Sequence, residues 1–235
     1  MSGSFYSHFI QLKPTKIGMW LSRVSSEIIF RYAGLTEGMN VLEIGPGLGA
    51  FADVCIKRSI EYYAVEPNRQ MADELEAKGV EVNRVIVPPL PEFNRTFDAV
   101  VMIQVLEHMD TMSSALQIVQ QIWHVLKPGG KIIVCSPDYM NLRINFFDCD
   151  FSHNFVTTRR RLDELLFSAG FRTVSSCYLS GPISGFLCIL LSAFVSRLPF
   201  GILSALFPDS KLLYRLYRLQ LKFSRSVLIV GERVI

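Results

Sequence analysis

The chain has 235 residues, of which 50% are hydrophobic and 19% are charged, and its formal net charge at neutral pH is +3. General disorder is excluded, because a disordered chain combines low hydrophobicity with a high net charge. The length suits one large domain, or one domain with an insertion. The mean hydropathy of +0.30 is high for a fully soluble protein, so a membrane-facing part has to be considered.

Cysteine usage indicates a reducing compartment. The chain contains five cysteines, scattered and without a CxxC pair: Cys55, Cys135, Cys149, Cys177 and Cys188. An odd, scattered set argues against a disulfide framework. The first residues have no charged segment followed by an apolar one, so no secretory signal is predicted and the expected location is the cytoplasm.

Apolar residues recur at helical spacing from Pro14 to about Tyr32 and predict a first helix. Beyond Gly34, short apolar runs alternate with helical segments, which indicates βαβ units and a parallel sheet. The predicted strands cover residues 39–44, 62–66, 80–87, 97–103 and 131–136. They are followed by a helix over 158–169, a strand over 171–179 and a final strand over 226–235.

A glycine-rich loop follows the first predicted strand. Gly45, Gly47 and Gly49 have the spacing GxGxG rather than the GxGxxG of dinucleotide-binding proteins, which argues against an NAD-dependent oxidoreductase. Glycines let the backbone turn tightly and approach a ligand, and the helix N-terminus behind them favours a polar or anionic group. Glu66 ends the second predicted strand about 20 residues later, where a carboxylate can accept hydrogen bonds from ribose hydroxyls.

Four blocks of the sequence, in order and with matching spacing, resemble the class I S-adenosylmethionine-dependent methyltransferases of the type 11/12-like group. These blocks are 43–49, 65–68, 97–108 and 125–131. The resemblance implies an α/β, Rossmann-like fold with a seven-stranded, mostly parallel sheet, helices on both faces and an antiparallel last strand. It also implies S-adenosylmethionine as the cofactor and methyl transfer as the activity.

The resemblance assigns cofactor-binding residues around the glycine loop. It implies that the backbone at Gly45, Gly47 and Gly49 approaches the amino-acid tail of the cofactor. It further implies that Glu43 holds the ammonium group, through water or backbone groups, and that Glu66 binds the ribose.

Further cofactor contacts are implied at the ends of the third and fourth strands. Gln104 would line the methionine side of the cofactor. Many relatives carry an acid after the third strand that contacts the adenine amine, but this chain has only apolar residues and prolines over 85–90. The adenine would therefore be held by apolar packing and backbone hydrogen bonds, with Ile86 and Val87 as its neighbours.

His108 and His153 are the candidate catalytic residues. His108 follows the fourth predicted strand, on the side where substrate would enter, and a capping or packing role is its alternative. His153 lies in a loop that shapes the acceptor pocket in this family, and with Asp148 or Asp150 it would form a general base with an orienting carboxylate. A loop hydrogen-bond network is the competing interpretation. The spacing of these three residues and Cys149 matches no strong metal site, so no metal is predicted.

The whole chain is predicted to form a single methyltransferase domain. An N-terminal helical segment (1–38) precedes the cofactor-binding core (39–180), and a hydrophobic and basic insertion (181–225) precedes the last strand (226–235). The first part of the insertion, Ile183–Ser196, carries no charge, but as a helix it would be about 21 Å long. A bilayer core is about 30 Å thick, and a single crossing could not return the chain to the sheet. We therefore expect no transmembrane helix; a second apolar piece follows at 200–207.

The third part of the insertion carries two stripes at helical spacing. One is basic: Lys211, Arg215, Arg218, Lys222 and Arg225. The other is apolar: Leu212, Leu216, Leu219 and Phe223. Adjacent basic and apolar stripes are typical of a helix that lies in a membrane interface. The insertion holds six basic residues and one acidic residue, so it concentrates the positive charge of the chain.

These features predict a methyltransferase that acts on an amphipathic or lipid-linked acceptor and is bound peripherally, through 183–225, to the cytoplasmic face of the membrane. Two alternatives stay open. The insertion is a lid or a dimer surface of a soluble small-molecule methyltransferase, or the protein binds the cofactor without catalysis and acts through a membrane or a partner. Nucleic acid is not an expected partner, because the rest of the chain is slightly acidic and has no basic, aromatic-studded groove.

Overall fold

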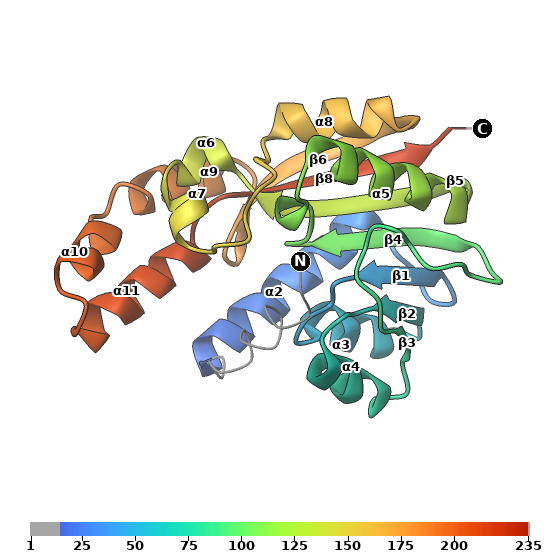
Figure 1. The fold of residues 1–235 in the computed structure, drawn as a ribbon, viewed down its shortest axis with the longest axis horizontal. Coiled ribbons are helices and arrows are strands. Elements are labelled where there is room, and N and C mark those ends of the chain that lie inside the picture. The colour runs from blue at the N-terminus through green and yellow to red at the C-terminus, as the bar shows by residue number, and fades with distance from the viewer. Residues whose placement is uncertain (1–14, 235) are drawn as a thin grey trace.

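One mixed β-sheet forms the centre of the part of the protein that the computed structural model describes, residues 15–234 (Figure 1). Its strands are β1 (Asn40–Ile44), β2 (Glu61–Val65), β3 (Glu81–Asn83), β4 (Phe97–Ile103), β5 (Leu126–Pro137), β6 (Phe171–Ser180), β7 (Ile183–Ser184) and β8 (Ser226–Arg233). Their order across the sheet is β3-β2-β1-β4-β5-β8-β6-β7. The five strands β1 to β5 are parallel to one another, and β8 runs antiparallel to both β5 and β6. The predicted Rossmann-like sheet is confirmed, with one strand more than the expected seven because β7 forms a short hairpin with β6.

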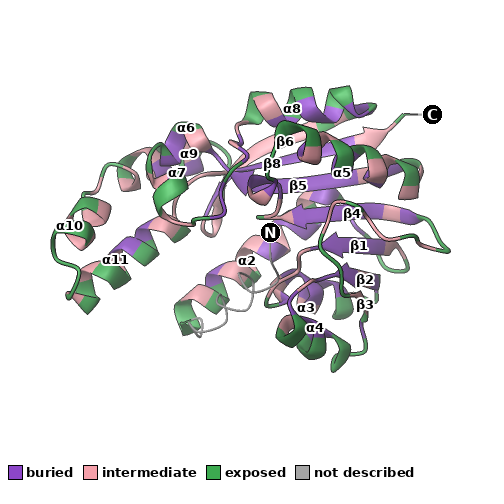
Figure 2. Cartoon of the chain, in the orientation of Figure 1, coloured by how far each residue is buried: buried purple, intermediate pink, exposed green. Residues whose placement is uncertain are grey.

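Helices cover both faces of this sheet, as predicted. α2 (Lys16–Ala33), α3 (Ala50–Ile56) and α4 (Arg69–Glu76) pack on one face, and α5 (Met112–Val125) and α8 (Arg159–Ser168) on the other. Successive strand residues point to opposite faces. Val41 therefore joins the core under α2 and α3, whereas Leu42 joins the core under α5 and α8. This two-sided burial, visible as continuous purple strands in Figure 2, explains why the central strands are almost wholly apolar.

Short polar side chains begin the main helices. Thr15, Thr111 and Thr158 each accept a hydrogen bond from a backbone N–H in the first turn of α2, α5 and α8, which satisfies a donor that has no partner within the helix. Gly34 ends α2 in a left-handed conformation, with a φ of 66°. These local signals place the helix boundaries close to those predicted.

Most strand boundaries lie within two residues of the prediction, with two exceptions. The central strand β5 begins at Leu126, five residues before its predicted start at residue 131. The other exception is the edge strand β3. β4 covers the predicted residues, whereas β3 ends at Asn83 instead of continuing to residue 87. β3 pairs only with β2, and β2 ends at Val65, which lies opposite Asn83. An edge strand cannot extend beyond its only neighbour, so residues 84–87 form a loop.

The insertion forms a helical lobe at one end of the sheet (Figure 1). The lobe consists of α9 (Phe186–Val195), α10 (Phe200–Leu206) and α11 (Lys211–Lys222). Leu179 of β6 pairs with Ser226 of β8, so the chain leaves and re-enters the sheet at the same end. Among the described residues, one segment, Phe186–Leu206, is long and apolar enough to cross a bilayer, and 11% of its apolar 18-residue window is buried. The break between α9 and α10 divides this segment into two short helices.

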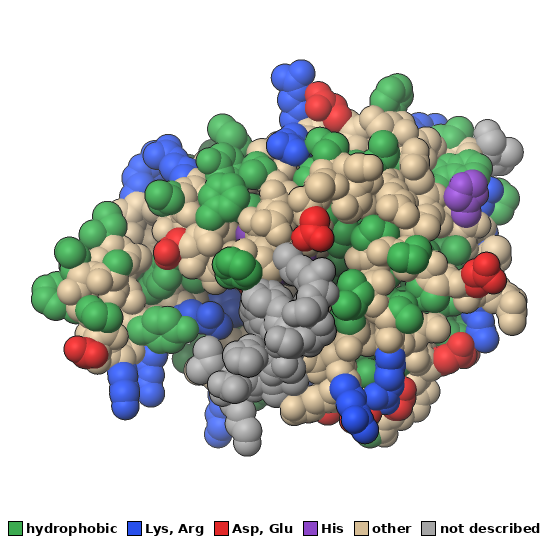
Figure 3. All heavy atoms as spheres, in the orientation of Figure 1, with side chains coloured by type: hydrophobic (Ala, Val, Ile, Leu, Met, Phe, Trp, Pro, Cys, Tyr) green, Lys and Arg blue, Asp and Glu red, His purple; other side chains and the backbone are tan. Residues whose placement is uncertain are grey.

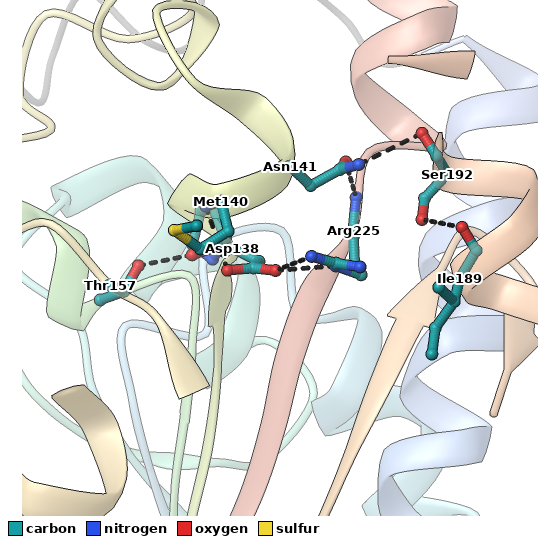
Figure 4. A network of polar contacts seen from close by, with 8 residues as sticks. Asp138, Met140, Asn141, Thr157, Ile189, Ser192 and Arg225 are labelled. Carbon is teal, nitrogen blue, oxygen red and sulfur yellow. Dashed lines mark hydrogen bonds and ion pairs between the residues drawn. The ribbon is translucent and has the colours of Figure 1, made fainter. Parts of the chain in front are cut away.

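A buried polar network joins the lobe to the sheet (Figure 4). The predicted basic stripe is wrong at Arg225, because α11 ends at Lys222. The Nη2 atom of Arg225 instead lies 2.6 Å from Oδ2 of Asp138, and these side chains are 16% and 1% exposed. Asn141, in the short helix α6 (Tyr139–Leu142), accepts a hydrogen bond from the backbone N–H of Arg225 at 2.9 Å and donates one to the carbonyl of Ser192 in α9 at 3.2 Å.

Removing one member of the buried pair should destabilise the protein strongly. Arg225→Met leaves the Asp138 carboxylate buried without its counter-charge, so we expect the free energy of unfolding to fall by about 3–5 kcal/mol. The double variant Asp138→Asn/Arg225→Met should recover most of this loss, because neither charge remains. Urea denaturation followed by circular dichroism measures both values. Equal losses in the single and double variants would contradict this account.

Candidate active site

The glycine loop connects β1 to α3 in a conformation that only glycine adopts readily. Gly45, Gly47 and Gly49 have φ values of 69°, 54° and 72°. A Cβ atom at Gly45 would lie 2.7 Å from Cγ2 of Val105, so a side chain there has no room. A Cβ atom at Gly47 would meet nothing within 4 Å, which means that the loop faces open space at this residue. The loop therefore lets a ligand approach its backbone closely.

Glu66 lies directly after β2 and is bound to the loop. Its Oε2 atom accepts a hydrogen bond from the Gly47 N–H at 3.0 Å, and its Oε1 atom accepts one from the Asn68 N–H at 2.9 Å. The residue is only 5% exposed, and burial raises the pKa of its carboxyl group above the ordinary value. The two backbone donors hold the carboxylate beside the open space at Gly47, which suits the predicted ribose contact.

Glu43, the penultimate residue of β1, is buried beneath the loop. Its carboxylate accepts a hydrogen bond from the hydroxyl of Tyr62 in β2. Burial raises its pKa to about 8, and the nearby Glu66 contributes in the same direction. Without a ligand, Glu43 is therefore mostly protonated at neutral pH.

The remaining predicted cofactor contacts occupy two different environments. Gln104 follows β4 and is exposed, with a φ of 57° that is uncommon for a residue other than glycine and is typical of functional sites. Ile86 is 42% exposed, whereas Val87 packs against the core under α5 and α8. Both lie in the loop that replaces the end of the predicted third strand, so their contact with adenine stays a prediction.

A cavity of about 240 Å³ lies at the carboxyl ends of β4 and β5, beside Gln104. This is the edge of an open α/β sheet where ligands bind. Its walls come from three parts of the chain: the loop after β4, the loop after β5, and α11 with the residues that follow it. The charged and imidazole side chains in these walls are Glu107, His108, Asp150, His153, Arg218 and Lys222.

The two predicted histidines lie together in this cavity, with ring centroids 5.0 Å apart. Nδ1 of His153 lies 2.6 Å from the carbonyl oxygen of Phe146, and because a carbonyl only accepts, this nitrogen carries the proton. Nδ1 of His108 lies 2.6 Å from Oγ of Ser152, which itself donates to Asp150 at 2.7 Å, so His108 also donates through Nδ1. Burial lowers the pKa of His108, which favours the neutral form of its ring.

The predicted pairing of His153 with Asp148 or Asp150 is not formed. Asp148, at the end of α7 (Asn145–Asp148), accepts a hydrogen bond from the hydroxyl of Tyr217 in α11 at 2.8 Å. That carboxylate therefore anchors the insertion. Asp150 is linked through a serine to the other histidine.

Three charged residues of the cavity were not predicted as part of the site. Glu107 is fully buried, and burial raises its pKa to about 8. Its place beside His108, at the end of the 97–108 block that resembles the family, was an available signal. Arg218 and Lys222 were assigned only to the basic stripe, because the packing of α11 against the core is not visible in the sequence.

Comparison with known proteins assigns the fold. Residues 18–176 match the family described as a methyltransferase domain, and no curated protein matches the chain in sequence. A phosphoethanolamine N-methyltransferase from Haemonchus contortus aligns with a TM-score of 0.65 at 15% identity, over 100% of this chain and 61% of that one. An S-adenosylmethionine-dependent methyltransferase from Archaeoglobus fulgidus aligns with a TM-score of 0.60 at 21% identity, over 90% and 94%. The N-methyltransferase NodS from Bradyrhizobium japonicum gives 0.61 at 12% identity, over 92% and 97%.

The sheet order, the glycine loop and the carboxylate at the end of β2 define a class I methyltransferase fold. The chain belongs to the methyltransferase domain family and is an S-adenosylmethionine-dependent methyltransferase. The open space at Gly47 and the adjacent Glu66 fit its cofactor. When bound, S-adenosylmethionine supplies a methyl group on a sulfonium centre. Gly47 would hold the amino-acid tail of the cofactor, and Glu66 would hold its ribose. Gln104 would lie beside the methionine part of the cofactor, where the cofactor faces the cavity.

Replacing Gly47 should weaken cofactor binding more than it weakens folding. In Gly47→Ala the added methyl enters the open space where the ligand approaches, so we expect the dissociation constant of S-adenosylhomocysteine to rise at least tenfold. Gly38→Ala is a matched control, because Gly38 also has a positive φ and open space around it but lies before β1. Isothermal titration calorimetry measures both. A similar loss of affinity in the two variants would show that backbone strain, and not contact with the ligand, is responsible.

The affinity for S-adenosylhomocysteine should increase as the pH is raised from 6 to 7.5. The ligand ammonium favours ionised Glu43, whose pKa in the free protein is about 8, so binding must release a proton at lower pH. We expect the affinity to increase between pH 6 and 7.5 by up to about tenfold per pH unit. Calorimetry in buffers with different ionisation enthalpies measures the proton release. Glu43→Gln should bind with a flat pH profile; a slope that persists in this variant would assign the proton to another group.

Proposed function

We propose that this methyltransferase acts on an amphipathic or lipid-linked acceptor, and that the helical lobe α9–α11 docks on the cytoplasmic face of a membrane. The acceptor would place its reactive group in the cavity beside Gln104, His108 and His153. The observation that carries the proposal is that one element, α11, lines this cavity and also belongs to an exposed apolar and basic surface.

The outer surface of the lobe is apolar over all three helices. Eight of its large hydrophobic side chains are each more than half exposed: Phe186, Leu187, Leu190, Phe194, Ile202, Leu206, Phe207 and Leu212. Figure 3 displays hydrophobic side chains gathered over this end of the molecule, with Lys and Arg side chains along the lower edge. A contiguous apolar surface rimmed by basic groups is typical of a membrane-binding site.

The basic stripe of α11 leads from this surface to the cavity. Tyr217 and Gln220 are the buried residues of the helix. At 100° per residue, the stripe lies on the opposite side from them. Its first half, Lys211 and Arg215, is exposed, and its second half includes Arg218, which lines the cavity. An anionic headgroup would therefore meet positive charge from the membrane surface to the site.

The cations beside the cavity suit an acceptor that carries an anionic group. Arg218 and Lys222 lie one helical turn apart in the cavity wall. Partial desolvation and the nearby Arg218 lower the pKa of Lys222. A bound anion would counteract both effects, because it stabilises the charged ammonium group. The Haemonchus contortus structure contains phosphomonomethylethanolamine, so the same fold accommodates a phosphorylated acceptor in that protein.

A second candidate follows from the same cavity wall. Because α11 closes one side of the cavity, the lobe can serve as a lid over a soluble small-molecule acceptor. The two functions differ in what they require of the exposed side chains. A lid needs only those residues of α11 that line the cavity, such as Arg218 and Lys222. Membrane docking also needs Lys211, Arg215 and the apolar surface.

Flotation with liposomes distinguishes these functions. We expect the protein to float with anionic vesicles at low salt and to bind neutral vesicles more weakly. Lys211→Ala/Arg215→Ala should weaken binding to anionic vesicles about 30-fold, since each basic residue contributes about 1 kcal/mol near anionic lipid. Phe194→Ser/Ile202→Ser should reduce binding to both vesicle types.

Matched variants on α8 control for general surface effects. Arg159→Ala/Arg160→Ala removes two exposed basic residues, and Phe167→Ser removes a phenylalanine that is 80% exposed. Both should float like the parent protein. If the parent protein binds no vesicles at any salt concentration while still binding S-adenosylhomocysteine, membrane docking is wrong and the lid function takes its place.

A further inference from the structure

The cavity contains a group of potential metal ligands that come from two separate loops. Glu107 and His108 follow β4, and His153 follows β5. One ligand atom from each of the three residues lies within 4.8 Å of the others. A tetrahedral ion with bonds of about 2.0–2.1 Å holds its ligand atoms roughly 3.3 Å apart. Side-chain movements on the order of 1 Å would bring the three into a common coordination sphere.

Glu107 is the least expected member of this group. It is 0% exposed, and neither of its carboxylate oxygens forms a hydrogen bond of normal geometry within residues 15–234, although the hydroxyl of Ser136 is close enough to lower its pKa. Burying a carboxyl group without a partner is unfavourable, and such a group in a native protein requires an explanation. Glu107 lines the cavity, so a cation bound there would contact oxygens that are otherwise unpaired.

The two histidines are oriented as metal-binding histidines are. A ligating imidazole usually donates through its second nitrogen to a carbonyl or carboxylate, which determines the tautomer. Here the Nδ1 atom of His153 donates to the Phe146 carbonyl, and that of His108 donates through Ser152 toward Asp150. Within residues 15–234, neither Nε2 atom forms a hydrogen bond to the protein. Each ring therefore offers an Nε2 lone pair.

We propose that Glu107, His108 and His153 bind a divalent transition-metal ion. Two imidazoles and one carboxylate form a donor set of zinc enzymes and of non-haem iron enzymes, and in both this set leaves a coordination position open. The open position would face the cavity and could take an oxygen atom of the methyl acceptor, a use that rests on the proposed function. Metal binding itself does not depend on the acceptor.

The electrostatic surroundings balance the charge of such an ion. Glu107, when it is ionised by the metal, and Asp150 supply negative charge on the protein side. Arg218 and Lys222 lie in the wall formed by α11 and supply positive charge. With the metal bound, the acceptor side of the cavity would be cationic, and it would favour an anionic or ionisable oxygen ligand.

Titration of the metal-free full chain with Zn²⁺ tests the proposal without any acceptor. Calorimetry should give one ion per chain with a dissociation constant below about 10 µM. Co²⁺ should give visible bands typical of four or five nitrogen and oxygen ligands. Glu107→Gln and His153→Gln should each weaken Zn²⁺ binding at least tenfold, whereas His8→Gln/His124→Gln, which removes the other two histidines, should bind like the parent chain.

The number of bound imidazoles provides a readout that a folding defect does not imitate. Electron spin-echo spectroscopy of the Cu²⁺ form should detect two imidazoles in the parent chain and one in His108→Asn. Thermal melting of the metal-free variants identifies any that fail to fold. The proposal is overturned if Zn²⁺ binds with no defined stoichiometry, or if it binds equally well to folded Glu107→Gln and His153→Gln. The methyltransferase assignment is tested separately, by binding of S-adenosylhomocysteine to the same metal-free chain.

Discussion

The buried ion pair between Asp138 and Arg225 determines where the insertion lies relative to the catalytic end of the sheet. Asp138 follows β5 and Arg225 precedes β8, so the pair closes the gap at which α11 reaches the sheet. Two charges that have left water are stable only in a well-defined geometry. The side chain of Gln220 extends this constraint across the lobe, because it donates at 2.8 Å to the carbonyls of Val195, the last residue of α9, and of Leu198, which follows α9. The cavity wall that α11 provides depends on this chain of contacts.

The core of the fold could be predicted from the sequence because its signals are local and repeated. β4 is apolar apart from Asp98 near its start, as burial on both faces requires, and its boundaries agree with the prediction. β3 was predicted too long, because the length of an edge strand depends on its neighbour and not on its own apolar residues. The two-residue strand β7 has no pattern of its own and exists only through its pairing with β6.

The same distinction between local and distant contacts applies to the site. The glycine loop and Glu66 could be predicted because a short turn and a strand end bring them together. The partner of Asp148 could not, because Tyr217 lies 69 residues further along the chain, in an insertion whose packing has no sequence signature. Arg225 is a similar case. Its spacing continues the basic stripe, but the helix ends before it and a buried carboxylate binds it instead.

Membrane docking and acceptor binding would be coupled because one helix takes part in both. α11 has twelve residues and is about 18 Å long. Its inner side is held by Tyr217 on Asp148 and by Gln220, so it cannot shift at the membrane without changing the cavity wall. An acceptor entering along the stripe would pass Lys211 and Arg215 before it reached Arg218 and the two histidines. The order of charges along α11 therefore suits an acceptor whose anionic group enters the cavity while its apolar part stays at the membrane surface.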